Sequence, residues 1–182
     1  MNIIETELPG VLIIEPRVFS DRRGCFLEVF HERRYREAGI PGAGRRFVQD
    51  NYSRSERGVL RGLHFQRVRP QGKLVLAGVG RVYDVVADID RRSPTFGRWI
   101  GVELSEENHR QLWIPPGYAH GFCVLSAHAD FQYKCTEFYH PELDAGVVWN
   151  DPTLAIDWPI DDPVLSDKDR ALPTLRQLDL EP

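Results

Sequence analysis

The stretch VYDVVADI at residues 82–89 carries the clearest periodic signal in the chain. Every second position from 83 to 89 is apolar, and the intervening positions include Asp84 and Asp88. Side chains that alternate with a period of two point to opposite faces of a β-strand. The stretch therefore predicts a strand with two carboxylates on one face, directed toward an interior cavity or a buried polar network. We assign Asp84 no catalytic role.

Short β-rich runs surround this strand on both sides. They cover residues 11–14, 59–64, 74–79, 100–104, 111–114, 120–125 and 131–135, and clusters of Gly and Pro separate them. Many short strands at close spacing predict an all-β sandwich or barrel. Helix is scarce: residues 31–38 predict one short helix, and residues 105–110 predict a helical turn with Ser105 as its N-cap. The Pro- and Asp-rich residues from 151 onward are expected to wrap the barrel as coil.

Length and composition narrow the class of protein. A chain of 182 residues with 42% hydrophobic residues predicts one domain over residues 1–182. Its 23 basic and 27 acidic residues give a net charge of −4, which argues against a polybasic nucleic-acid binder. No run approaches the roughly 20 apolar residues of a membrane span. Three cysteines without CxxC spacing argue against a zinc site or a disulfide framework and fit a cytoplasmic location.

Three polar groupings could carry chemistry inside such a barrel. Arg61 and His64 lie in RGLHFQ at 61–66, Lys73 lies in QGKLV at 71–75, and His120 follows the turn in PPGYAHGF at 115–122. His and Lys can move protons or stabilise an enolate near neutral pH. A metal centre of the cupin type needs His-x-His on one strand, but Gln replaces the second His at position 66. We therefore expect no metal.

Blocks along nearly the whole chain resemble the dTDP-4-dehydrorhamnose 3,5-epimerase family. These blocks are DRRGCFLEVF at 21–30, FVQDN at 47–51, GVLRGLHFQ at 58–66, QGKLV at 71–75, VYDVVADIDRRSPTFGRW at 82–99, LSEENHRQLWIPPGYAHGF at 104–122, YKCTEFYHP at 133–141, WNDP at 149–152 and LSDKD at 165–169. Several blocks in the family's order are far more specific than one short motif. The resemblance implies a cupin-type β-barrel (jelly roll) that works as a homodimer on a dTDP-4-keto-6-deoxyhexose, without metal or cofactor.

The resemblance also implies catalytic roles for four residues. It assigns His64 as the base, Asp169 as the carboxylate that holds it, Tyr133 as the acid on the other face of the sugar, and Lys73 as the cation that stabilises the enolate. The chemistry agrees with these residue types, because hydrogens at C3 and C5 of a 4-ketohexose both lie beside the carbonyl. Removing either hydrogen gives an enolate, and returning a proton to the opposite face inverts that carbon.

Ten further positions match the family's substrate contacts. The resemblance places Arg23, Arg61 and Lys168 near the diphosphate, where charge-assisted hydrogen bonds are strong. It matches Glu28, Gln49 and Asn51 to hydrogen bonds with the nucleotide or sugar, Tyr139 to stacking on thymine, Phe26 and Phe19 to contacts around the base (Phe19 from the partner subunit), and His120 to the sugar at the barrel mouth.

The sequence departs from the family pattern at two places, and three alternative functions remain open beside the epimerase. The loop at 67–71 is shorter than usual, which could displace Lys73, and Phe138 replaces a second tyrosine beside Tyr139. The first hypothesis is inversion at both C3 and C5. The alternatives are a mono-epimerase of the same fold, a non-catalytic sugar-nucleotide-binding cupin, and a metal-dependent cupin oxygenase.

Overall fold

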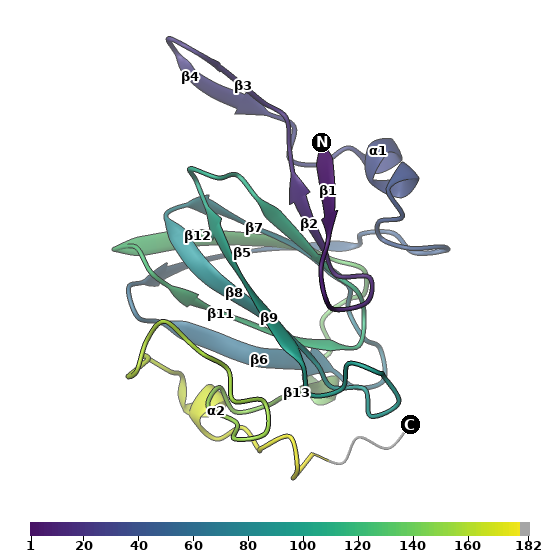
Figure 1. The fold of residues 1–182 in the computed structure, drawn as a ribbon, viewed down its shortest axis with the longest axis vertical. Helices are drawn as coiled ribbons and strands as arrows, with labels where there is room; N and C mark the ends of the chain where they lie inside the picture. Colours follow the sequence, from purple (N-terminus) through teal and green to yellow (C-terminus); the bar gives the residue numbers. More distant parts are fainter. Residues whose placement is uncertain (179–182) are drawn as a thin grey trace.

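The computed structural model describes residues 1–178 and consists mainly of two antiparallel sheets that face each other (Figure 1). The six-stranded sheet contains, in spatial order, β1 (Asn2–Glu5), β2 (Leu12–Glu15), β10 (Gln111–Ile114), β7 (Lys73–Val79), β12 (His128–Cys135) and β5 (Gln49–Glu56). The five-stranded sheet contains β13 (Asp144–Gly146), β6 (Leu60–Gln66), β11 (Tyr118–Val124), β8 (Arg81–Asp88) and β9 (Trp99–Ser105). The predicted all-β class is therefore confirmed.

The structure also contains short helices and a separate two-stranded hairpin. The helices are α1 (Glu32–Glu37), α2 (Asp167–Arg170) and the 3-10 turn η1 (Pro141–Leu143). The hairpin consists of β3 (Val18–Asp21) and β4 (Gly24–Leu27), which pair with each other and with no other strand of residues 1–178. Within residues 1–178, no helix is long and apolar enough to cross a membrane.

The main core lies between the two sheets. It joins apolar side chains from both, among them Val75, Leu112 and Phe131 from the six-stranded sheet and Val86 and Phe122 from the five-stranded sheet. Burial of apolar area at roughly 25 cal/mol per Å² is the main force that holds such facing sheets together. One end of this interior is polar rather than apolar, and the candidate site occupies that end.

The outer face of the five-stranded sheet is also covered. The tail after residue 146 packs on the five-stranded sheet through Leu154, Trp158 and Leu175, which contact Val85 and the other outward side chains of β8 and β6. The tail therefore lies against the sandwich, and the helix α2 interrupts the coil expected there. This arrangement also explains why β8 carries apolar side chains on both faces, with Val82 and Val86 in the main core and Val85 and Ala87 against the tail.

The eight strands predicted from sequence are all present, with ends that differ by at most three residues. The prediction missed β1, β3, β4, β5 and β13. The strand β5 was missed because QDNYSRSE is polar on both faces, and its inward residues Asn51 and Ser53 lie near a polar interior rather than an apolar core. The helical turn predicted at 105–110 is present as a single turn: the N–H of His109 donates to the carbonyl of Ser105 at 2.9 Å, and Ser105 Oγ caps the turn by accepting from two backbone N–H groups, but the segment does not continue as a helix.

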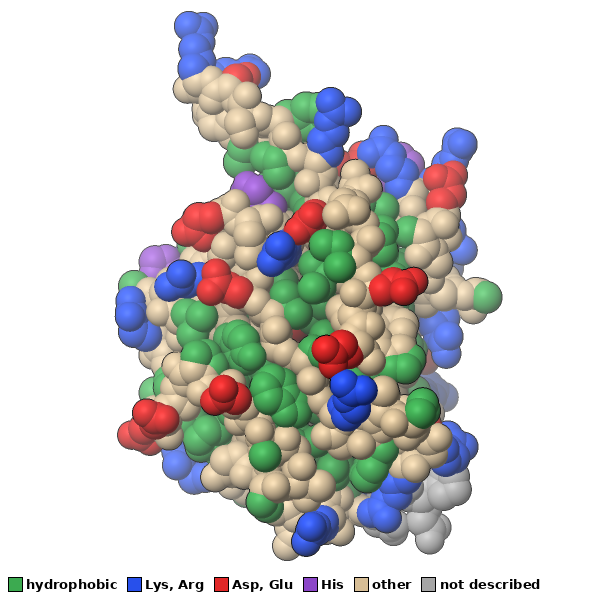
Figure 2. All heavy atoms as spheres, viewed as in Figure 1, with side chains coloured by type: hydrophobic (Ala, Val, Ile, Leu, Met, Phe, Trp, Pro, Cys, Tyr) green, Lys and Arg blue, Asp and Glu red, His purple; other side chains and the backbone are tan. Residues whose placement is uncertain are grey.

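The hairpin β3–β4 projects away from the sandwich. Figures 1 and 2 show it standing clear of the body of the molecule, beside the end of the sandwich at which β1 begins. Phe19 is 50% exposed and Phe26 is 70% exposed, although their rings lie near each other with centroids 6.5 Å apart. Exposed large aromatic side chains on a projecting element are typical of an interaction surface.

Candidate active site

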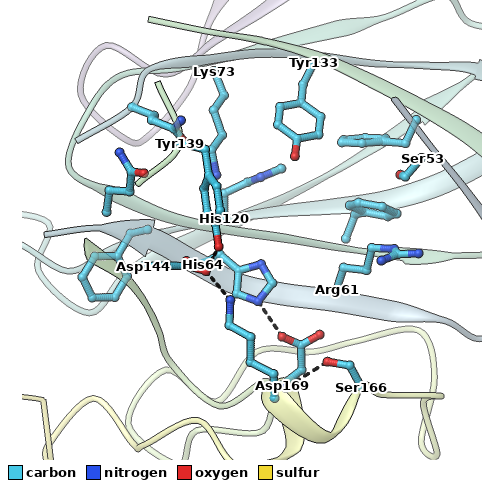
Figure 3. Close-up of a pocket in the computed structure, with 16 residues that line it drawn as sticks. Ser53, Arg61, His64, Lys73, His120, Tyr133, Tyr139, Asp144, Ser166 and Asp169 are labelled. Carbon is cyan, nitrogen blue, oxygen red and sulfur yellow. Dashed lines mark hydrogen bonds and ion pairs between the residues drawn. The ribbon is translucent and has the colours of Figure 1, made fainter. Parts of the chain in front are cut away.

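A polar cavity of about 350 Å³ opens between the two sheets (Figure 3). Its volume lies at the lower end of the range for ligand pockets. Eight of the predicted site residues line it: His64, Lys73, Tyr133, Asp169, Arg61, His120, Tyr139 and Lys168. All four predicted catalytic side chains are therefore gathered around one space, although their positions in the sequence span more than 100 residues.

A β-bulge places Arg61 and His64 on the same face of β6. Residues three apart in a regular strand point to opposite faces. Here the strand pairing with β11 matches His64 to His120 but Arg61 to Phe122, so three steps along β6 oppose two along β11. The extra residue turns both side chains toward the cavity. Glycine at 62 allows the backbone of β6 to lie close to the backbone of β11, because a Cβ there would lie 2.5 Å from the Cα of Gly121.

His64 forms a close pair with Asp169. The Nε2 atom of His64 lies 2.5 Å from Asp169 Oδ1, and the carboxylate side chain is only 6% exposed. Burial opposes ionisation of Asp169, but the hydrogen bond and charge of His64 outweigh it and hold the carboxyl pKa below its usual range. An ionised Asp169 accepts a hydrogen bond from the Nε2–H of His64. The Nδ1 atom of His64 is left with the lone pair, and it forms no hydrogen bond within residues 1–178.

The short helix α2 delivers Asp169 to this position. Ser166 is its N-cap, and its Oγ accepts a hydrogen bond from the backbone N–H of Asp169 at 3.1 Å. A Ser followed three residues later by an acidic residue is a recognisable helix-start pattern. This helix is absent from the elements predicted from the sequence, although the pattern S-D-K-D at 166–169 indicates it.

Tyr133 and Lys73 approach the cavity from the opposite wall. They belong to β12 and β7 of the six-stranded sheet, whereas His64 belongs to the five-stranded sheet, and Figure 3 shows the phenol and the imidazole on opposite sides of the space. Burial raises the pKa of Tyr133, so its phenol stays protonated near neutral pH. Lys73 Nζ forms no ion pair or hydrogen bond with the described residues, which leaves its donors free.

The short loop before Lys73 does not displace it. Lys73 opens β7 and lines the cavity. The preceding residues are anchored, because Gln71 Nε2 donates to the carbonyl of Glu137 at 2.9 Å and the N–H of Gly72 donates to Thr136 Oγ1 at 2.8 Å.

His120 lies at the inner wall beside a buried carboxylate. Its Nε2 is 2.9 and 3.0 Å from the two oxygens of Asp84, whose side chain is completely buried. Sequence reasoning proposed a cavity or a polar network for Asp84 and Asp88. Asp84 faces the histidine of the cavity, whereas Asp88 accepts hydrogen bonds from Ser93 and Thr95 in a separate network.

The mouth of the cavity holds a cluster of three polar side chains. Asp144 Oδ2 accepts a hydrogen bond from the Tyr139 hydroxyl at 2.8 Å and a charge-assisted hydrogen bond from Lys168. The sequence analysis identified Tyr139 and Lys168 but missed Asp144, which lines the cavity with Ser53, Gln66, Gln71 and Ser166. No local pattern distinguishes Asp144, Ser53, Gln66 and Gln71 from ordinary surface polar residues, so only the fold reveals them.

Six predicted substrate-binding residues do not line this cavity. Phe19, Arg23 and Phe26 lie on the projecting hairpin, and Arg23 is paired there with Asp21. Glu28 follows the hairpin and pairs with Arg34 at 2.7 Å. Gln49 and Asn51 lie on β5 beside the mouth: Gln49 Oε1 accepts from the backbone N–H of Tyr139 at 2.9 Å, and Asn51 contacts Cys135 Sγ at 3.7 Å.

The arrangement is suited to moving protons beside a carbonyl. It combines an imidazole backed by a carboxylate, a protonated phenol on the facing wall and an ammonium group with free donors. These are the groups needed to remove a proton, stabilise the resulting oxyanion and return a proton from the other side. Residues 1–178 contain no cluster of three or more His, Cys, Asp or Glu side chains that could hold a metal ion.

Comparisons with known proteins identify the family. The chain matches the dTDP-4-dehydrorhamnose 3,5-epimerase family over residues 5–177. It is 56% identical over 173 residues to the dTDP-4-dehydrorhamnose 3,5-epimerase of Shigella flexneri, with 93% of each chain covered.

Solved structures agree in fold and sequence. A dTDP-6-deoxy-D-glucose-3,5-epimerase of Legionella pneumophila, solved in complex with dTDP-4-keto-L-rhamnose, superposes with a TM-score of 0.93 at 55% identity, covering 98% of this chain and 94% of that one. A 3'-monoepimerase of Streptomyces bikiniensis, in complex with dTDP-quinovose, superposes with a TM-score of 0.87 at 35% identity, covering 94% and 86%. The chain therefore belongs to the dTDP-4-dehydrorhamnose 3,5-epimerase family, and its activity is the epimerisation for which that family is named.

Proposed function

We propose that this chain converts dTDP-4-keto-6-deoxy-D-glucose to dTDP-4-keto-L-rhamnose by inverting C5 and C3, with His64 and Tyr133 acting on opposite faces of the hexose. The observation that carries the proposal is the position of the two groups. They come from different sheets of the sandwich and line one cavity. A ring bound between them presents one face to a base and the other to an acid.

Each inversion follows the same route. His64 Nδ1 removes the hydrogen from the carbon beside the C4 ketone, and the electrons move onto the ketone oxygen to form an enolate. Tyr133 then donates its phenolic proton to the other face of that carbon. The imidazolium and the phenolate that result are restored by proton exchange with solvent, so no cofactor is consumed. Asp169 supports the imidazolium that forms, as the carboxylate does in other His–carboxylate pairs.

Lys73 is the group that we assign to the enolate oxygen. Its ammonium forms no competing ion pair with the described residues, and it projects from the same sheet as Tyr133 (Figure 3). Removing one preorganised group that stabilises a developing oxyanion lowers kcat roughly 10²–10³-fold in comparable sites. Arg61 and Lys168, at the rim, are assigned to the diphosphate.

We further propose that the chain acts as a homodimer in which the β3–β4 hairpin completes the partner's site. A cavity of about 350 Å³ has room for a hexose but not for the nucleotide as well, so part of the ligand must lie outside it. Phe19, Arg23 and Phe26 offer aromatic and cationic contacts on a hairpin that stands clear of its own chain (Figure 2). The resemblance assigns these residues to the base and the diphosphate.

The single-domain organisation and the cytoplasmic location stay predictions.

A coupled assay tests the proposed reaction. Purified protein is supplied with dTDP-4-keto-6-deoxyglucose, the downstream reductase and NADPH, and the expected product is dTDP-L-rhamnose. The His64→Ala variant should lose about 10²–10⁴-fold in rate, whereas His128→Ala, which alters an exposed histidine outside the cavity, should not. Full activity of His64→Ala would refute the assignment. Solvent deuterium at only one of C3 and C5 would identify a mono-epimerase instead.

A further inference from the structure

A short segment without regular structure carries Tyr139 at the mouth of the cavity. Residues 136–140 follow β12 and belong to no helix or strand, so no strand pairing satisfies their backbone. Tyr139 lines the cavity, although it is 49% exposed. An exposed side chain on such a segment is expected to be mobile. The contacts around Tyr139 instead hold both its backbone and its ring.

Gln66 holds the backbone on both sides of Tyr139. It is the last residue of β6 and is only 4% exposed. Its Oε1 accepts a hydrogen bond from the N–H of His140 at 2.7 Å, and its Nε2 donates to the carbonyl of Phe138 at 3.2 Å. The same Nε2 donates to the carbonyl of Arg69 at 2.7 Å. A glutamine side chain thus supplies the hydrogen bonds that a neighbouring strand would otherwise supply.

The amide of Gln66 can make these bonds in one orientation only. Exchanging its oxygen and nitrogen would place an oxygen against the carbonyls of Arg69 and Phe138, and an NH2 group against the N–H of His140. Both N–H groups of the amide are used, so Gln66 has no donor left for a substrate although it lines the cavity. The position that carries the second histidine in the metal-binding His-x-His pattern therefore holds a loop in this chain.

Two further contacts complete the hold on Tyr139. Gln49 Oε1 accepts from its backbone N–H at 2.9 Å, and Asp144 Oδ2 accepts from its hydroxyl at 2.8 Å (Figure 3). Side chains from β5, β6 and β13 thus converge on one exposed tyrosine and its neighbours. A side chain that is ordered before binding loses less entropy when a ligand stacks on it.

We propose that Gln66 is a positioning residue for nucleotide binding, which fixes the backbone on both sides of Tyr139 so that its ring forms a preorganised platform for the thymine base. The inference rests on the proposed function, in which the ligand is a dTDP-sugar whose nucleotide lies outside the hexose cavity. Gln66 itself makes no bond to the nucleotide and acts through Tyr139. It differs from Gln71, whose bond to the carbonyl of Glu137 lies two residues before the ring.

The Gln66→Met variant removes the three hydrogen bonds and keeps an unbranched side chain of similar length. Asn108→Leu is the matched control. The wild-type amide of Asn108 also forms three bonds to the backbone, with Ser105, Arg110 and Glu103, in a turn outside the cavity. A loss of stability common to both variants then reports the lost hydrogen bonds alone.

The ring of Tyr139 can be observed directly, because the chain contains only six tyrosines. In protein labelled with 13C in the tyrosine rings, Tyr139→Phe identifies the Tyr139 signal. We expect NMR relaxation of the free protein to report an ordered Tyr139 ring in the wild type and in Asn108→Leu, and a mobile ring with a shifted signal in Gln66→Met. An ordered ring with an unshifted signal in Gln66→Met would overturn the proposal.

Calorimetric titration with dTDP gives the functional readout. Gln66→Met should bind dTDP roughly 2–10-fold more weakly than the wild type, the cost of ordering one side chain on binding. Asn108→Leu should bind dTDP like the wild type. In a Tyr139→Ala background, Gln66→Met should add no further loss, because it acts through the missing ring. Wild-type affinity in Gln66→Met, or a loss of the same size in both backgrounds, would overturn the proposal.

The two measurements separate this proposal from the proposed function. Wild-type dTDP affinity in Tyr139→Ala would refute the assignment of Tyr139 to the nucleotide and, with it, the nucleotide role of Gln66. The relaxation measurement needs no ligand, so an ordered ring in Gln66→Met refutes positioning by Gln66 and leaves the assigned role of Tyr139 intact.

Discussion

The reactivity of His64 depends on what its two ring nitrogens contact. Nε2 is held by Asp169 and Nδ1 is free of hydrogen bonds within the described residues, so one tautomer is favoured and its lone pair is available. The motif around His64 can be found in the sequence. Asp169 cannot be identified as its hydrogen-bond partner from spacing in the sequence. It lies 105 residues away and reaches His64 only when the tail folds back over the five-stranded sheet.

Asp169 should also make the stability of the protein depend on pH. Its pKa is lowered in the folded state, so its ionised form contributes stability above the unfolded value of about 3.9, and that contribution is lost as the pH falls through the folded pKa. Asp169→Asn should therefore cost about 1.5–3 kcal/mol at neutral pH, the usual value for a hydrogen bond to a charged group. Urea unfolding at several pH values checks this: the difference from wild type should shrink below pH 4, and a difference independent of pH would contradict it.

Local backbone devices position the catalytic side chains. The bulge in β6 turns Arg61 and His64 to one face, and the N-cap Ser166 starts the helix that carries Asp169. Strands with apolar alternation, such as β8, were predictable because their faces meet a core. The polar strand β5 was not predictable, because it has no apolar periodicity, and the four-residue helix α2 was indicated only by the S-D-K-D pattern at 166–169.

The helix α2 should be sensitive to its cap. Removing an N-cap hydroxyl costs about 1 kcal/mol, and if that loss disorders Asp169, Ser166→Ala should lower kcat about fivefold. Ser105→Ala is the control, because Ser105 Oγ accepts two backbone hydrogen bonds in a turn outside the cavity. Both variants should lose similar stability in thermal unfolding. Equal loss of kcat in the two variants would show that α2 does not position the carboxylate.

The shape of the whole molecule separates the predicted site into two parts. The sandwich gathers the catalytic residues, whereas the hairpin carries Phe19, Arg23 and Phe26 away from them. Sequence resemblance could place all of these residues at one ligand. Apart from assigning Phe19 to the partner subunit, it could not show which of these residues fail to reach the cavity of their own chain, because that depends on the direction in which the hairpin leaves the sandwich.

Mixing two inactive variants tests the exchange of hairpins between subunits. Arg23→Ala damages the hairpin, and His64→Ala damages the cavity. If each hairpin serves the partner's cavity, a heterodimer of the two variants contains one intact site, so coexpression in equal amounts should restore about a quarter of wild-type activity. The variants assayed separately are the control. If each hairpin served its own chain, every heterodimer would have two damaged sites and activity would not return.

The central claim is that an imidazole and a phenol act on opposite faces of one hexose, and Tyr133→Phe in deuterated water tests it most directly. His64 should still remove and return protons on its own face, so NMR should show deuterium entering C3 or C5 of the recovered substrate without inversion. The wild type should place deuterium at both carbons of the inverted product. Inversion of both carbons by Tyr133→Phe at the wild-type rate would contradict the account.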